Sequence, residues 1–217
     1  MTRYSPYSEG TGLKLGRPGP GIEARDFTGR AWELLELLNE AGALTSGPAA
    51  RVLETNRRKV ASAFETLRLS GMARYADVFT PRSSFRLWFP AASRPPREAG
   101  EACRLAALAM LFAAARREVV GFAWQILRNG KTGVMARMDF RDPDGRDLRW
   151  IVDAPRSGEV PAALADLYIV PGENDAALVP PGKVYITDEV LLEILETGEE
   201  LGSRLREKTL DAAVESG

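Results

Sequence analysis

The stretch that decides the fold is residues 30–89, RAWELLELLNEAGALTSGPAARVLETNRRKVASAFETLRLSGMARYADVFTPRSSFRLWF. Within it, apolar residues recur at spacings of three and four over residues 30–42 and again over residues 57–71. That spacing is typical of amphipathic helices with one buried face. A shorter helix is expected between them, over residues 46–53, where a serine and a proline occupy positions that favour a helix start.

Two strands are expected after the third helix. Residues 72–76 and 84–89 have the two-residue alternation of β-strands, and residues 77–83 supply the turn between them. Three helices followed by such a hairpin resemble the winged helix-turn-helix domains of bacterial transcription regulators and replication initiators. The resemblance implies double-stranded DNA binding, with the third helix in the major groove and the hairpin beside it.

The predicted DNA-binding residues are Asn56, Arg57, Arg58, Lys59, Arg82 and Arg86. The basic triplet falls on the first turn of the third helix, where a recognition helix presents its side chains to DNA. Arg57 and Arg58 are expected to reach guanine edges, and Lys59 to meet a phosphate. Asn56 is expected to contact adenine or the DNA backbone, and Arg82 lies near the tip of the hairpin. Two alternatives stay open: a solvated helix face, and a winged helix that contacts protein.

Charge is divided unevenly along the chain. Residues 1–150 contain 24 Lys and Arg against 16 Asp and Glu, whereas residues 151–217 contain 5 against 14. A split of this size indicates a basic binding surface followed by an acidic appendage. A merely solvated acidic helix explains the second part equally well.

Several chemistries are excluded by composition. Histidine is absent and cysteine occurs once, as Cys103. His-based metal sites, Ser-His-Asp triads, Cys-His pairs and an internal disulfide are therefore excluded. No phosphate-binding loop, dinucleotide-binding motif or calcium-binding loop is present, so no cofactor and no metal ion are expected. With no membrane-length apolar run and no signal-peptide pattern, we expect a cytoplasmic protein that does not enter a membrane.

The fold class predicted for the whole chain is α+β, with a winged helix-turn-helix followed by a domain built on a mostly antiparallel sheet. The second part begins with an alanine-rich helix, and its NG and DG dipeptides are typical of hairpin turns. A final acidic helix is expected over residues 188–210. The expected divisions are a flexible arm over residues 1–29, the winged helix over 30–90, a linker over 91–100 and the α+β domain over 101–217.

The carboxylates of the second part invite comparison with the PD-(D/E)XK nuclease core. That core needs two acids to hold Mg²⁺ and a lysine two residues beyond the second acid. Asp139 and Asp153 take the places of the acids, but Ala154 and Pro155 follow, without a lysine. The later pair, Asp166 and Asp188, also lacks one. We therefore assign no catalytic residue and do not expect an enzyme.

A narrower resemblance covers both parts of the chain. The segments RVLETNRRKVASAFETLRLSGMARY, ADLYIVP and KVYITDEVLLE resemble the replication-relaxation proteins of plasmids and integrative elements. That family pairs a winged helix with a nuclease-like domain, and its second strand usually carries a glutamate where this chain has Ile186 or Thr187. The resemblance implies a mobile-element context and a degenerate nuclease-like domain.

The function expected from these observations is sequence-specific DNA binding in transcription regulation, or in plasmid or mobile-element replication or transfer. The second domain is expected to mediate homodimerisation or to bind a protein partner through the acidic C-terminal helix. The candidate apolar residues of that interface are Leu191, Leu192, Leu195 and Leu201, and the alternative is that this amphipathic helix is ordinary core cover. Two alternatives stay open: a divergent metal-dependent nuclease delivered by the winged helix, and a ligand-gated repressor whose pocket is lined by Trp124, Trp150 and Tyr168.

Overall fold

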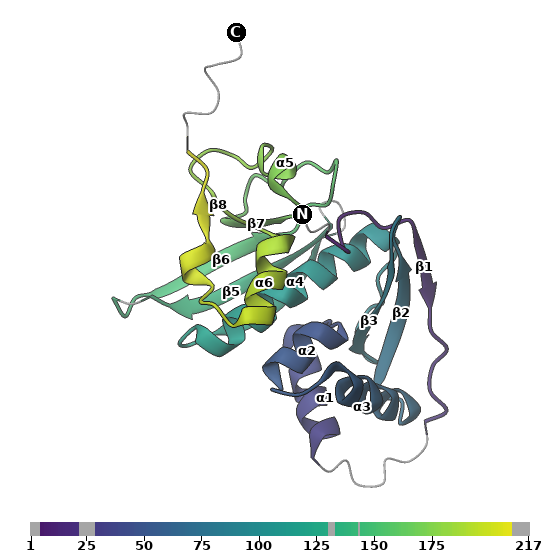
Figure 1. The fold of residues 1–217 in the computed structure, drawn as a ribbon. Coiled ribbons are helices and arrows are strands. Elements are labelled where there is room, and N and C mark those ends of the chain that lie inside the picture. Colours follow the sequence, from purple (N-terminus) through teal and green to yellow (C-terminus); the bar gives the residue numbers. More distant parts are fainter. Residues whose placement is uncertain (1–4, 22–28, 130–132, 143, 210–217) are drawn as a thin grey trace.

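The computed structural model describes residues 5–21, 29–129, 133–142 and 144–209, which form a mixed α+β fold (Figure 1). The first part contains β1 (Gly12–Leu15), α1 (Arg30–Ala41), α2 (Ser46–Val52), α3 (Arg57–Leu69), β2 (Ala73–Phe79) and β3 (Ser84–Pro90). It is followed by α4 (Ala99–Glu118), β4 (Ala123–Asn129), β5 (Gly133–Arg141) and β6 (Asp147–Asp153). The chain continues through β7 (Leu167–Val170), α5 (Glu173–Ala176), β8 (Val184–Thr187), α6 (Asp188–Thr197), a 3₁₀ turn (Gly202–Arg204) and β9 (Arg206–Glu207).

Helices α1, α2 and α3 and the β2–β3 hairpin lie within a few residues of their predicted positions. Their apolar faces meet in one cluster that includes Leu34, Phe64 and Trp88. The rings of Phe64 and Trp88 stack with their centroids 4.7 Å apart, which fixes α3 against the hairpin. Backbone hydrogen bonds between Leu44 and Trp88, at 2.8 and 2.9 Å, tie the segment between α1 and α2 to β3.

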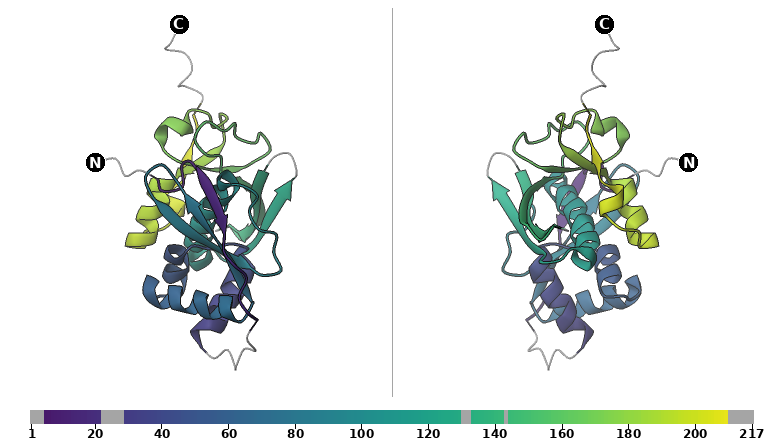
Figure 2. Two further views of the ribbon diagram at one scale, coloured as in Figure 1. Left: turned by 90° about the vertical axis from the view of Figure 1, so that its right-hand side faces the viewer. Right: turned by 90° about the vertical axis from the view of Figure 1, so that its left-hand side faces the viewer.

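The segment predicted as a flexible arm contains a strand, and this differs from the expectation. β1 pairs antiparallel with β2, from Gly12 opposite Phe79 to Leu15 opposite Ala76, so the first sheet has the order β1-β2-β3 (Figure 2). Tyr7, which precedes the strand, is also buried. Four strand residues among glycines and prolines are too few to show a period in the sequence. Residues 1–4 and 22–28 of the predicted arm lie outside the described residues.

The longest helix, α4, lies between the two parts of the fold. Every residue from Leu105 to Ala115 is buried, which is the behaviour of a helix that is apolar on all sides. Ala109 and Phe112 belong to the cluster formed by α1–α3, whereas Leu105 and Leu108 pack in a second cluster that includes residues of both sheets. The core is therefore continuous across residues 91–100, the stretch predicted to be a linker.

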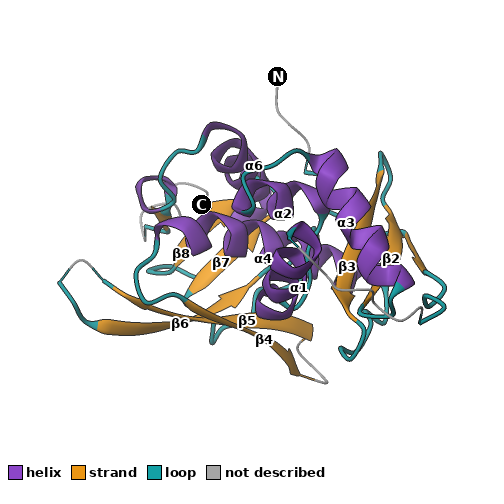
Figure 3. Ribbon diagram, turned by 90° about the horizontal axis from the view of Figure 1, so that it is seen from below, coloured by secondary structure: helices purple, strands orange, loops and turns teal. Residues whose placement is uncertain are grey.

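The second sheet has six strands in the order β4-β5-β6-β7-β8-β9. The β4–β5, β5–β6 and β8–β9 pairs are antiparallel, and the β6–β7 and β7–β8 pairs are parallel. The expectation of a mostly antiparallel sheet is thus confirmed. Seen from below, helices α4 and α6 lie on the same side of this sheet (Figure 3).

The acidic C-terminal helix is shorter than predicted. α6 ends at Thr197, because Gly198 adopts a left-handed conformation (φ 83°) and its N–H closes the last turn on Ile194 O. The chain then forms the 3₁₀ turn and β9, which pairs with β8. The prediction of a helix to residue 210 was wrong, because it passed over a glycine at a position where helices commonly stop.

Candidate nucleic-acid interface

The turn between α2 and α3 fixes the start of α3. Asn56 caps the helix: its Oδ1 accepts a hydrogen bond from the backbone N–H of Lys59 at 2.9 Å. Glu54 is the one non-glycine residue with positive φ (47°) in the described chain, and this conformation turns the backbone from α2 towards α3. Arg30 Nη1 donates to Leu53 O at 2.7 Å and so joins the turn to α1. Asn56 therefore fixes the start of α3, and it is also exposed at that end of the helix.

The basic triplet projects from the first turn of α3. Val60, Phe64 and Leu67 face the core, and this leaves the side chains of Arg57, Arg58 and Lys59 exposed. The described residues provide no carboxylate within ion-pair distance of these three cations, in contrast to Arg68, whose Nε lies 2.7 Å from Glu65 Oε2. The structure thus brings four of the six predicted site residues, 56–59, together on one solvent-facing turn.

Arg86 has a different role from the other predicted residues. Its Nε donates to Asp77 Oδ1 at 2.8 Å, and its Nη1 donates to Glu65 Oε1 at 3.0 Å. The guanidinium carbon also lies 3.9 Å from the centroid of the Tyr75 ring. The hydrogen bond to Asp77 is the largest cause of a raised pKa for Arg86. Two carboxylates compensate this charge, so Arg86 joins α3 to the hairpin.

Arg82 is exposed in the turn between β2 and β3. Thr80 holds that turn closed, since its N–H donates to Ser83 O at 2.9 Å. Phe85, just beyond the turn, lines a cleft that Arg57 also lines. The start of β3 and the first turn of α3 therefore flank the same concave part of the surface, whereas the turn itself does not line it.

The acids compared with a nuclease core do not form a metal site. Asp153 is buried in an ion pair with Arg104, at 2.7 Å, and Asp139 pairs with Arg149 on the uncovered face of the sheet, at 2.6 Å. In the pairing of β5 with β6, Asp153 lies opposite Met135, which is four residues along β5 from Asp139. The two acids are therefore about 13 Å apart along the direction of the strands. In the described residues, no group of three His, Cys, Asp or Glu side chains is placed to hold a metal ion.

The three aromatic residues proposed for a ligand pocket do not form one group, because Tyr168 belongs to a different cluster from Trp124 and Trp150. Trp124 packs against Phe112, with centroids 5.8 Å apart, and Trp150 packs edge-on against Phe140. Tyr168 belongs to a separate cluster and donates a hydrogen bond to Ala162 O at 2.7 Å. Trp124 and Trp150 both lie opposite Met138 of β5 and so share a face of the sheet, whereas alternation within separate strands gave no information about the position of Tyr168.

Comparison with protein-family models, with curated proteins and with solved structures found no match to this chain. None of the described helices, α4 included, combines the length and the apolar composition that crossing a membrane requires.

Proposed function

We propose that this chain binds double-stranded DNA sequence-specifically, with α3 in the major groove as part of a winged helix-turn-helix. The observation that carries the proposal is the exposed first turn of α3, where Arg57, Arg58 and Lys59 have no carboxylate partner among the described residues. Unpaired guanidinium groups on a rigid helix are suited to guanine edges and phosphates. Each good bidentate contact to a base contributes about 1–3 kcal/mol of discrimination.

The surroundings of α3 support the same proposal. Asn56 fixes the start of the helix, and the stacked Phe64 and Trp88 rings fix its buried face. A helix held at both places loses little conformational freedom on binding, so more of its contact energy remains as affinity. The exposed Arg82 in the β2–β3 turn is the second contact point, beside the groove that α3 enters.

DNA binding by this chain serves the regulation of transcription, or the replication or transfer of a plasmid or mobile element. The second sheet provides the surface for a homodimer or a protein partner. The leucines predicted for an interface on α6 do not, because Leu191 and Leu201 are buried in the main core cluster and Leu192 and Leu195 pack against it. A dimer would place two copies of α3 on two half-sites and so increase the number of phosphate contacts. The test of this part is the molar mass of the chain, free and on DNA, by light scattering.

The decisive experiment is a fluorescence-anisotropy titration of a labelled random duplex, repeated from about 50 to 200 mM salt. The parent is compared with a variant in which Arg57, Arg58 and Lys59 are all alanine. On a random duplex all three side chains contact mainly phosphates, so the loss of three charges should make the slope of log K against log salt shallower by about 2–3. Selection of bound sequences from the random pool then tests specificity.

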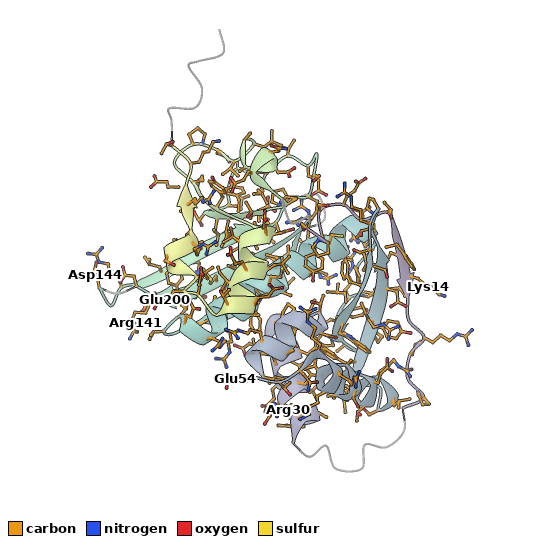
Figure 4. The ribbon with its side chains drawn as sticks, viewed as in Figure 1. Lys14, Arg30, Glu54, Arg141, Asp144 and Glu200 are labelled. Carbon is orange, nitrogen blue, oxygen red and sulfur yellow. The ribbon has the colours of Figure 1, made fainter. Side chains whose placement is uncertain are left out.

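The matched control replaces Arg141, Arg146 and Arg149 with alanine. These also remove three positive charges, but they lie on the β5–β6 hairpin, whose far end is marked by Arg141 and Asp144 in Figure 4, away from α2 and α3. We expect the control to keep the parent's salt slope. Equal losses in both triple variants would mean that net charge alone governs binding, and that result would overturn the proposal.

A further inference from the structure

A cleft of roughly 690 Å³ separates the α2–α3 turn from α6. Thr45, Arg51, Glu54 and Arg57 line it from the helical part, and Leu192, Leu195 and Glu196 line it from α6. Phe85 of β3 contributes to the lining as well. The volume lies within the range of about 300–1,000 Å³ that is typical of small-molecule sites.

The walls of the cleft differ in chemistry. Leu192 and Leu195 are partly buried and pack against the main core cluster, so they present a fixed apolar surface. On the other side, the Arg57 guanidinium lies over the start of α2, with Nη2 3.5 Å from the point that a Cβ on Gly47 would occupy. Glu54 and Glu196 also line the cleft, and Glu54 pairs with Arg117 at 3.6 Å. The apolar surface opposite Arg57 fits a molecule that has an apolar body and one negative charge, placed away from these two carboxylates.

A buried hydroxyl in the lining also indicates a ligand. Thr45 is 5% exposed and lies close to the buried Tyr7 hydroxyl, but its Oγ1 makes no hydrogen bond of ordinary length and angle in the described structure. A buried polar atom without a partner is costly, and such atoms in native proteins are usually satisfied by water or by a ligand. Because Thr45 and Arg57 line the same cleft, one anionic group has both a hydroxyl donor and a guanidinium within this site.

We propose that the cleft binds a small organic anion, a ring or short chain with one carboxylate or sulfonate, and that this ligand competes with DNA for Arg57. The competition rests on the proposed DNA-binding function, whereas the binding of the anion does not. The acid group pairs with Arg57 and Thr45, and the apolar body lies on Leu192, Leu195 and Phe85. DNA and ligand then weaken each other's binding by the same factor.

The test uses 1-anilinonaphthalene-8-sulfonate, an aromatic sulfonate whose fluorescence rises in apolar surroundings, titrated into the full chain. We expect saturable binding that Arg57→Ala weakens about tenfold and Leu195→Ser also weakens. Thr45→Val keeps the shape of the side chain and removes the hydroxyl, so it should weaken binding several-fold while the melting temperature is kept. The control is Arg58→Ala, because Arg58 is adjacent in sequence but is not part of the cleft lining.

Two results would overturn the site: absence of saturable binding, or equal affinity for the parent, Arg57→Ala, Leu195→Ser and Thr45→Val. The competition is tested by repeating the DNA titration with the sulfonate present, which should reduce the affinity of the parent for DNA. Binding of both ligands without mutual effect would refute the competition alone. Sulfonate binding by a chain that binds no DNA would leave the site standing and refute the DNA-binding proposal.

Discussion

A buried ion pair between Arg156 and Asp188 gives the sharpest test of the packing described above. The two side chains are 3% and 0% exposed, and Arg156 Nη1 lies 2.8 Å from Asp188 Oδ2. The same guanidinium donates to the carbonyl oxygens of Ala154 and Ile169, at 3.0 and 2.8 Å. Ser5, near the N-terminus, donates its hydroxyl to the Asp188 carboxylate as well. One arginine therefore holds the loop after β6, strand β7 and the start of α6 together.

We predict that Arg156→Met destabilises the chain by about 3–5 kcal/mol, because it leaves the Asp188 carboxylate buried without its cation. For a chain of this length, each kcal/mol corresponds to about 2–4 °C in Tm, so Tm should fall by about 6–20 °C. Asp188→Asn should also destabilise the chain. The double variant should be less destabilised than the sum of the two single variants, because the pair is then removed as a unit.

The assay is urea unfolding followed by circular dichroism, with thermal melts as a second measurement. The control is Arg149→Met, since Arg149 is 64% exposed and its ion pair with Asp139 lies at the surface. Such exposed pairs contribute little to stability, so Arg149→Met should leave the unfolding midpoint almost unchanged. A loss below about 1 kcal/mol for Arg156→Met, or strict additivity in the double variant, would refute the reasoning.

Three further predictions follow from single residues. Gly42→Ala should lower the free energy of unfolding, measured by urea titration, by at least about 1–2 kcal/mol. The reason is that Gly42 has φ 74° and that a Cβ at this position would lie 2.8 Å from Ile126 Cγ1. An unchanged urea midpoint would contradict this prediction. Burial raises the pKa of the Cys103 thiol to about 12, so a thiol reagent at pH 8 should react in denaturant and hardly at all with the folded chain. The hydrogen bond from Arg149 lowers the pKa of Asp139, so Arg149→Ala should raise that pKa towards its ordinary value in a carboxyl NMR titration. Because that folded-state pKa is depressed, the pair's small stabilisation is present above the unfolded pKa of about 4 and is lost as the pH falls through the folded value.

The local parts of the fold were predictable from the sequence. Helices α1 and α3 have a clear apolar period, although the cap of α3 is Asn56 and not the neighbouring Thr55, which is also a residue type that favours this position. Pairings over long sequence distances were not predictable. β1 forms only because β2, some sixty residues later, offers it a partner, and four residues carry no period of their own. α4 is apolar on every side, so its sequence indicated burial but not what would cover it.

The candidate site was predictable to the same degree. The cluster from Asn56 to Lys59 needed only the position of one helix start. Arg86 was misjudged, because alternation placed it on the outer side of a strand without revealing that Asp77 and Glu65 were within reach. The cleft lined by Arg57 and Leu195 was missed, because its walls are about 140 residues apart and only the fold brings them together.

The position of α4 limits how this chain can be rearranged by recombination. Phe112 completes the core of the first three helices, while Leu105 and Leu108 of the same helix complete the core shared with the second sheet. A gene fusion that exchanged either part at residues 91–100 would separate a helix from half of its neighbours. The two parts are therefore expected to be inherited together, and a chimaera that grafts a foreign sheet onto residues 5–90 would have to bring along this helix with its sequence intact.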